Sequence, residues 1–209
     1  MYLSKLLLDP KSRQVQCEIS NRYELHRTLT AQFPEKNRKD IDLLYRLELA
    51  NYQSAANITL LVQTQLFANW DNLVNTGMLT TIPEVKLFEV DFFEGDSFYF
   101  RLLGNPTIRR KQPDGKSKRV GLYAPEAQQD WLKRKADQGG FKILGVQLRD
   151  FGLIESRKRK NNETFVIKHQ AVQFDGLLKI TDTDKFNKTI KNGIGSAKAF
   201  GFGLLSLAK

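Results

Sequence analysis

Three neighbouring side chains in the first part of the chain could act on a phosphate ester: Tyr23, His26 and Arg27. An imidazole, with a reference pKa of about 6.5, can accept or donate a proton at neutral pH. A tyrosine, with a reference pKa of about 10, is normally neutral and better suited to orienting a hydroxyl or donating a hydrogen bond. Arg27 could hold a charged phosphate. A lone histidine on a helix is more often structural or merely exposed, so this triplet alone is only suggestive.

A helix over residues 22–33 is predicted to position these side chains. Asn21 and Glu24 have the spacing of a capping box, in which the asparagine accepts early amide hydrogens and the glutamate bonds back to the cap. At about 100° per residue, apolar side chains recur on one arc and the triplet falls on the next arc, facing away from the core. The apolar arc consists of Leu25, Leu29 and Phe33.

The chain offers few ligands for a catalytic metal, because it has two histidines and one cysteine. His169 lies in a predicted strand without clean alternation and is interpreted as structural or incidental. Cys17 is interpreted as a small hydrophobe, although a nucleophilic role is possible. No metal and no cofactor are expected, so any phosphodiester chemistry should be metal-free.

Four consecutive cations, Arg157, Lys158, Arg159 and Lys160, precede Asn161 and Asn162, which indicate a turn between two strands. Such charges repel one another unless solvent or a polyanion neutralises them. The run is either a solvated face or a phosphate-binding hairpin tip, and its place in the basic half of the chain favours phosphate binding.

A glycine-rich segment near the end could also approach a phosphate closely. Its glycines permit positive φ, so that successive amide hydrogens can point toward one anion. The spacing matches neither a nucleotide-binding P-loop nor a dinucleotide fingerprint. A tight turn into a last strand is an equally good interpretation. The candidate binding residues of this segment are Gly193, Gly195, Ser196, Lys198, Gly201 and Gly203.

The formal net charge is +10, and the excess lies in the second half. Residues 1–96 carry ten Lys and Arg against thirteen Asp and Glu, whereas residues 97–209 carry twenty-three against ten. This distribution favours nucleic acid as the partner, ahead of an anionic membrane surface or a merely soluble basic surface. Residues 105–119 form a basic loop that is interpreted either as mobile surface or as a direct RNA contact.

The elements that position these residues repeat one order twice. Strands are predicted near residues 1–8, 43–49, 58–64 and 85–90, with helices at 22–33 and 70–74. The second half has strands at 98–103, 141–154, 165–174 and 203–207, with helices at 125–138 and 182–192. The fold class is therefore α+β, with the split β-α-β-β-α-β topology in residues 1–94 and again in 97–209. No export signal and no membrane-spanning stretch is evident, so the cytoplasm is expected.

Several segments together resemble the CasE family, the repeat-processing subunit of type I-E Cascade. They run nearly end to end and include Tyr2 to Leu6, Asp9 to Arg13, Asn21 to Leu29, Phe100 to Pro106, Gln170 to Gly176 and the glycine-rich segment. The resemblance implies two tandem ferredoxin-like, RNA-recognition-motif-like domains. It also implies that the substrate is a CRISPR repeat RNA hairpin, cut at the 3′ side of its stem to release mature guide RNA that stays bound with the other Cascade subunits.

Within this resemblance, the family's tyrosine and histidine correspond to Tyr23 and His26, and its basic hairpin corresponds to residues 157–160. The expected activity is a metal-independent endoribonuclease that leaves 2′,3′-cyclic phosphate and 5′-hydroxyl ends. Two alternatives remain open: a non-catalytic RNA-binding module in which His26 is incidental, and a scaffold protein whose basic half docks an acidic partner.

Overall fold

The computed structural model describes residues 1–33, 38–48, 57–113, 115–160 and 163–209. The chain divides into two compact units. The first consists of Met1–Val90, Glu155–Ile167 and Lys198–Leu204, and the second of Asp91–Ile154, Lys168–Ala197 and Leu205–Lys209. The division into domains at residues 1–94 and 97–209 stays a prediction.

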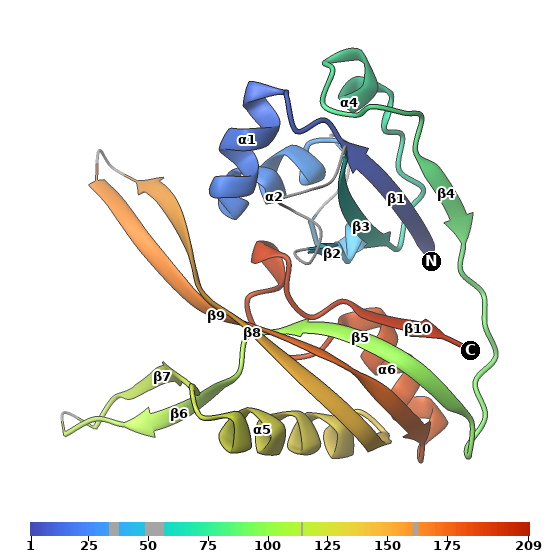
Figure 1. Ribbon diagram of the computed structural model, residues 1–209, viewed down its shortest axis with the longest axis vertical. Helices are drawn as coiled ribbons and strands as arrows, with labels where there is room; N and C mark the ends of the chain where they lie inside the picture. The colour runs from blue at the N-terminus through green and yellow to red at the C-terminus, as the bar shows by residue number, and fades with distance from the viewer. Residues whose placement is uncertain (34–37, 49–56, 114, 161–162) are drawn as a thin grey trace. The chain divides into compact units, whose positions relative to one another are not determined.

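The first unit contains a four-stranded antiparallel sheet in the order β2-β3-β1-β4 (Figure 1). Its strands are β1 (Tyr2–Leu8), β2 (Leu44–Leu47), β3 (Ile58–Thr64) and β4 (Glu84–Leu87). The helices of this unit are α1 (Arg13–Ser20), α2 (Arg22–Thr30), α3 (Arg38–Ile41) and α4 (Asp71–Asn75). Apolar side chains of α1, α2 and the sheet form one buried cluster that includes Val15, Leu29 and Leu60.

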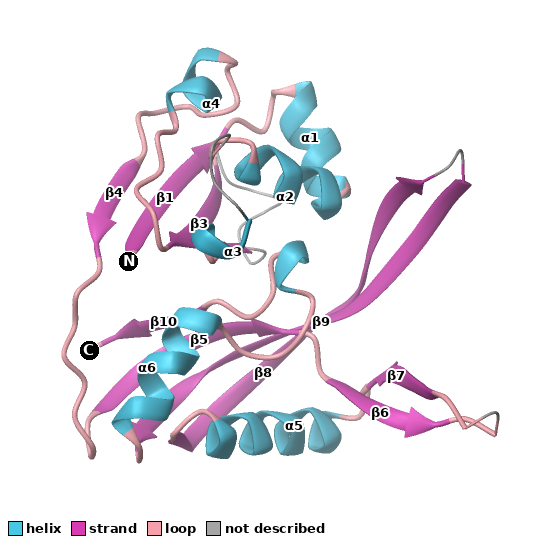
Figure 2. Cartoon of the chain, turned by 180° about the vertical axis from the view of Figure 1, so that it is seen from behind, coloured by secondary structure: helices cyan, strands magenta, loops and turns pink. Residues whose placement is uncertain are grey.

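The second unit has a sheet in the order β10-β5-β9-β8. Its strands are β5 (Ser97–Gly104), β8 (Phe141–Lys160), β9 (Glu163–Ile180) and β10 (Leu205–Ala208). The end of β8 and the start of β9, within Glu155–Ile167, group with the first unit. The helices α5 (Pro125–Gln138) and α6 (Thr183–Asn192) pack beside these strands (Figure 2). Trp131 of α5 stacks on Phe174 of β9, and Phe186 of α6 meets Phe141 of β8 edge to face.

Each sheet places its strands in the order fourth, first, third, second along the chain of that unit. The fold therefore consists of two tandem ferredoxin-like topologies, and the predicted α+β class is confirmed. The second copy differs by an inserted two-stranded ribbon, β6 (Thr107–Lys111) and β7 (Ser117–Gly121). Among the helices of the described residues, none is both long and apolar enough to cross a membrane.

One segment was predicted wrongly, and one helix was not predicted. The basic segment 105–119 is not an irregular loop, because its ends pair as β6 and β7 around the turn at Gly115. Helix α1 was not predicted, because this short segment of mostly polar residues has only two buried apolar side chains, Val15 and Ile19. The residue 49 end of the second predicted strand and the Asn161-Asn162 turn lie outside the described residues.

Gly176 allows β8 and β9 to approach closely. A Cβ at this position would collide with the carbonyl oxygen of Gly145 and lie 3.0 Å from Cα of Val146. Gly145 itself faces open space, since a Cβ there would meet nothing within 4 Å.

We expect Gly176→Ala to lower the free energy of unfolding by roughly 1–3 kcal/mol, the usual cost of overpacking a site whose neighbours are backbone atoms. Gly145→Ala is the matched control and should leave stability nearly unchanged. Urea denaturation of both variants measures the difference. Equal stabilities would contradict the close approach.

Candidate active site

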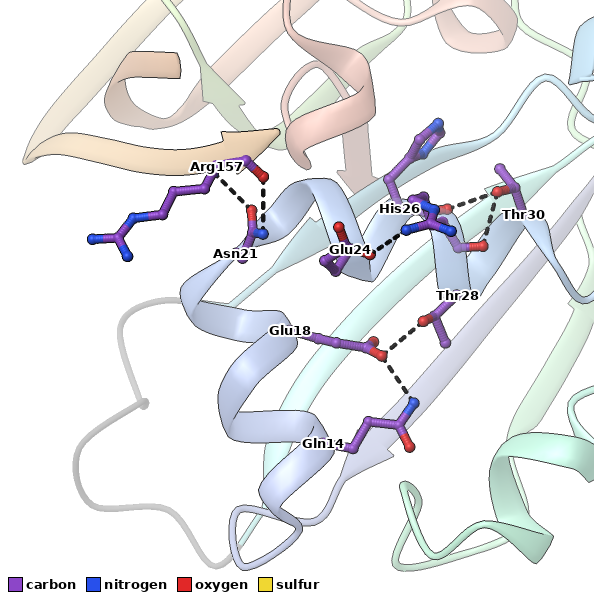
Figure 3. A network of polar contacts seen from close by, with 9 residues as sticks. Gln14, Glu18, Asn21, Glu24, His26, Thr28, Thr30 and Arg157 are labelled. Atoms are coloured by element: carbon purple, nitrogen blue, oxygen red, sulfur yellow. Dashed lines mark hydrogen bonds and ion pairs between the residues drawn. The ribbon is translucent and has the colours of Figure 1, made fainter. Parts of the chain in front are cut away.

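The start of α2 is held by β8 rather than by its own cap. The side-chain amide of Asn21 donates from Nδ2 to the carbonyl oxygen of Arg157 at 3.0 Å, and the Arg157 amide donates to Asn21 Oδ1 at 3.0 Å (Figure 3). Asn21 makes no capping hydrogen bond, and Glu24 pairs with Arg27 instead of bonding back. The predicted capping box was therefore wrong. The Asn21 side chain pairs with the Arg157 backbone as a neighbouring strand would. It thereby holds the basic end of β8 beside α2.

Arg22 and Tyr45 fasten α2 to the C-terminal segment 198–204, which belongs to the same unit. The Tyr45 hydroxyl lies 3.1 Å from the carbonyl oxygens of both Arg22 and Ala199. The buried Arg22 guanidinium donates to the Phe200 carbonyl at 3.3 Å and lies over the Phe202 ring. Burial raises the pKa of Tyr45 well above its ordinary value, although the Arg22 charge lowers it in part. Tyr45 is thus a neutral hydrogen-bond donor at any physiological pH.

Gly201 makes this contact possible. Its φ is +82°, and a Cβ would lie 2.9 Å from Cε2 of Tyr45 and 3.3 Å from Nη1 of Arg22. Any side chain at this position would push the 198–204 segment away from both residues. The structure therefore gives Gly201 a packing role, whereas its predicted role as an RNA ligand stays a prediction.

The His26 ring lies on the buried Tyr45 ring, with 6.3 Å between centroids and 16° between planes. His26 is half-buried, and its Nδ1 is fully buried. In Figure 3 the ring points away from the polar contacts that join Glu18 to Thr28. The histidine therefore packs against the neutral ring of Tyr45, and its side chain remains partly accessible to solvent.

Tyr23 occupies the preceding turn of the same helix, on the side of the basic strand. Its ring lies 6.5 Å from Phe200, and the Lys158 ammonium lies 5.3 Å from its centroid, within the range of a cation–π contact. Residues three apart on a helix are neighbours, at about 5–6 Å between Cβ atoms. The structure therefore brings Tyr23, His26 and Lys158 to one side of α2, next to segment 198–201.

Arg27 extends to solvent and pairs with Glu24 at 2.8 Å. Exposed pairs of this kind contribute little, about 0.3–0.5 kcal/mol on a helix. An approaching phosphate could therefore displace Glu24 at small cost.

On the inner side, the buried Glu18 accepts hydrogen bonds from Gln14 and Thr28 and so links α1 to α2 (Figure 3).

Comparisons with known proteins match the whole length of the chain. A family model described as CRISPR associated protein matches residues 1–209. The chain belongs to this family. It is 34% identical over 219 residues to the CRISPR-associated endoribonuclease Cse3 of Thermus thermophilus, covering all of both chains. It is 32% identical over 218 residues to the Cascade subunit CasE of Escherichia coli, covering 100% of this chain and 99% of the relative. The predicted resemblance to CasE is confirmed.

Solved structures agree with the sequence comparison. Cse3 bound to a 19-nucleotide RNA superposes with a TM-score of 0.85 at 33% identity, and the match covers 100% of each chain. Cas6e of Escherichia coli superposes with a TM-score of 0.70 at 26% identity, covering 100% of this chain and 99% of that one.

The remaining predicted site residues of this CRISPR-associated protein are spread over both units. Lys198, Gly201 and Gly203 lie in the first unit, with Gly203 buried at a φ of 91°. Gly193, Gly195 and Ser196 lie in the second unit. Arg159 and Lys160 continue β8, but their side chains lie outside the described residues.

His169 is far from the catalytic candidates in sequence and lies in the second unit. Its Nδ1 is 3.1 Å from Nδ2 of Asn105, beside a cavity of about 670 Å³ at the base of the β6–β7 ribbon. Among the described residues, no three His, Cys, Asp or Glu side chains gather as metal ligands would.

Tyr45, Arg22 and the true role of Asn21 were not predicted from the sequence. Arg22 shares the apolar arc of Leu25 and Leu29, so its helical position did indicate burial. Tyr45 and Asn21 gave no such signal, because Ala199 and Arg157, the partners that join them to other segments, lie more than a hundred residues away in the sequence.

We expect Tyr45→Phe to lower the free energy of unfolding by about 0.5–1.5 kcal/mol, the usual net contribution of an internal hydrogen bond, because it removes the hydroxyl that bonds to the Arg22 and Ala199 carbonyls. Tyr99→Phe is the control, since that ring is 63% exposed and its hydroxyl can be replaced by water. Denaturant titration of both variants gives the comparison. A Tyr45→Phe protein as stable as the control would contradict the proposed anchoring role.

Proposed function

We propose that the chain is an endoribonuclease that cleaves CRISPR repeat hairpins in precursor RNA at the 3′ side of the stem. The product is mature guide RNA, which the enzyme retains as a subunit of Cascade. The observation that supports this most is the placement of His26 and Tyr23 on one helix beside Lys158, in a chain that aligns end to end with an endoribonuclease.

The proposed reaction is internal attack. The 2′-oxygen bonds to the adjacent phosphorus as its proton leaves, and the bond from phosphorus to the 5′-oxygen breaks. The 5′-oxygen takes up a proton, so the ends are a 2′,3′-cyclic phosphate and a 5′-hydroxyl. His26 serves one of the two proton transfers, through Nε2, since its Nδ1 is buried.

Tyr23 and the nearby cations have supporting roles in this scheme. Tyr23 orients the 2′-hydroxyl or donates a hydrogen bond to the phosphate. Lys158 and Arg27 stabilise the negative charge that develops on phosphorus. The reaction needs no metal, because internal attack supplies the nucleophile and these cations supply the charge.

Recognition rests on stem shape and backbone charge. The major groove of an A-form RNA helix is deep and narrow, so base edges inside a stem are hidden from side chains. The basic end of β8 then acts as a backbone contact, and Asn21 fixes its distance from α2.

The test incubates purified protein with a labelled repeat hairpin in EDTA. Cleavage should persist, and mapping of the ends should give a cyclic phosphate and a 5′-hydroxyl. A single 2′-deoxy substitution at the cut site should stop the reaction while binding stays nearly intact. Robust cutting of that substrate would exclude internal attack, and binding without any cutting would favour a non-catalytic RNA-binding module.

We expect His26→Ala to slow cleavage at saturating enzyme by roughly 10²–10⁴-fold, the usual contribution of a general acid or base. RNA affinity should change little, because the imidazole is assigned to proton transfer. His169→Ala, which removes the other histidine of the chain, is the control and should cleave at the wild-type rate. Wild-type cleavage by His26→Ala would overturn the assignment.

We expect Lys158→Gln to flatten the log–log salt dependence of RNA binding by about 0.7–0.9, the loss of one phosphate contact. Lys86→Gln on β4 removes the same charge from the same unit and should leave the slope unchanged. Cleavage by Lys158→Gln at saturating enzyme should recover at least in part. An unchanged slope for Lys158→Gln would show that this lysine only packs on Tyr23.

A further inference from the structure

Arg22 carries a buried positive charge one helical turn before His26. Its side chain is only 2% exposed. Residues four apart on a helix are neighbours, with about 5–6 Å between their Cβ atoms. A guanidinium does not lose its proton in proteins, so this charge is present at every physiological pH. The start of α2 therefore places a permanent cation near the histidine that is assigned to proton transfer.

The ring of Tyr45 lies beside both Arg22 and His26. A Cβ on Gly201 would lie 2.9 Å from Cε2 of Tyr45 and 3.3 Å from Nη1 of Arg22, so the guanidinium approaches the edge of that ring. The His26 ring stacks on the same Tyr45 ring, with 6.3 Å between centroids. Burial raises the pKa of Tyr45 and the Arg22 charge lowers it in part, so the charge is felt at this ring. Arg22 and His26 are thus close in space as well as in sequence.

Burial makes the Arg22 charge effective over this distance. Water and dissolved ions screen exposed charges, whereas they screen buried charges much less. A cation near an imidazole disfavours its protonated form, and so does removal of the ring from water. His26 is itself half-buried. Both effects therefore favour the neutral imidazole.

Three acids on the elements around His26 have other partners or other directions. Glu24 forms an ion pair with a neighbour on α2. Glu18 of α1 is hydrogen-bonded on the side of α2 that the His26 ring points away from (Figure 3). Glu155 stands three residues before Lys158 in β8, so the two side chains point to opposite faces of that strand.

The other ionisable groups on these elements are tyrosines and cations. The cations are exposed or half-buried, so salt screens them more than it screens Arg22. The 3₁₀-helix η1 (Lys198–Phe200) supplies one of them, since it packs against α2. The full set is Tyr23, Arg27, Tyr45, Arg157, Lys158 and Lys198.

We propose that Arg22 is a positioning residue for the cleavage reaction, because its buried charge keeps His26 in the neutral form in the free enzyme. Arg22 is too buried to act on the RNA directly, so it acts through His26 and sets the pH range of the reaction. The inference rests on the proposed function, since it takes His26 as the group that transfers the proton. It holds whether His26 accepts the first proton or donates the second.

The experiment titrates the two histidines of the chain by NMR without RNA, and His26→Ala assigns the signals. Wild-type His26 should titrate below its reference pKa of about 6.5. Arg22→Gln should raise the pKa of His26 by roughly one pH unit, the effect of a unit charge about 10 Å away at an effective dielectric constant of about 20. The titration of His169, which lies in the second unit, should be the same in both proteins.

Two matched variants separate the charge of Arg22 from its packing. Arg22→Lys keeps the charge but loses the planar guanidinium, so the protein should melt at a lower temperature while His26 titrates as in wild type. Arg46→Met removes a second buried arginine that donates to segment 198–204. Arg46 follows Tyr45 in β2 and points to the opposite face of the sheet, so this variant should also melt lower without shifting His26.

The wild-type protein tests the proposal without any substitution. Raising the salt to about 0.5 M should leave the low pKa of His26 largely in place, because salt screens a buried charge much less than the exposed ones. A wild-type His26 that titrates at about 6.5 or above would overturn the proposal. An unchanged titration in Arg22→Gln, or an equal rise in Arg22→Lys or Arg46→Met, would overturn it as well.

Cleavage of the labelled hairpin connects this titration to the reaction. Rates at sub-saturating enzyme report the groups of the free enzyme, so the inflection that His26 causes should move to higher pH in Arg22→Gln by the amount seen in NMR. Wild-type cutting with an unshifted Arg22→Gln profile would overturn this inference and leave the proposed function intact. Absence of cutting by the wild type would overturn the proposed function, and this role of Arg22 with it, whatever the NMR titration shows.

Discussion

The structure around the candidate active site depends on one buried hydroxyl. Tyr45 is fully buried, so its hydroxyl must find hydrogen-bond partners inside the protein. The partners are the carbonyls of Arg22 at the start of α2 and of Ala199 near the end of the chain. The His26 ring stacks on the same Tyr45 ring. The hydrogen bonds of the Tyr45 hydroxyl therefore help to fix the surface against which His26 packs.

Burial of Arg22 makes the C-terminal segment part of the same construction. A guanidinium stays charged even when buried, so it requires polar or aromatic compensation. The carbonyl of Phe200 and the ring of Phe202 contribute to it. Arg46 repeats the arrangement, because it pairs with Glu48 and donates to the Leu204 carbonyl. Two buried arginines thus hold segment 198–204 at its carbonyls, and Gly201 is required because a Cβ would separate the partners.

The periodicity of apolar residues predicted the helix and the sheets that support this site. It could not predict the hydrogen bonds between segments that are distant in the sequence. The apolar arc of Leu25, Leu29 and Phe33 is buried as expected, and both split sheets follow from the order of strands and helices. Asn21 had the correct spacing for a cap, yet a strand 136 residues later offered its amide two partners at once. The contact with Arg157 replaces the helix cap, because it satisfies both the amide donor and the oxygen acceptor of the Asn21 side chain. The 105–119 segment was misjudged for a similar reason: its cations indicated a solvated loop, whereas its ends had the register of a ribbon.

On the proposed function, the placement of charge accounts for a nuclease that keeps its product. His26 packs against the neutral ring of Tyr45, and the basic end of β8 lies beside the start of α2, where Asn21 holds it. Contacts with stem phosphates are the same before and after the cut, so they stabilise substrate, transition state and product alike. They provide affinity without accelerating the chemical step, and cleavage does not weaken them. The contacts that change as the bond breaks are those made at the scissile phosphate, by Tyr23, His26, Lys158 and Arg27. A single cut therefore leaves the contacts with the stem in place.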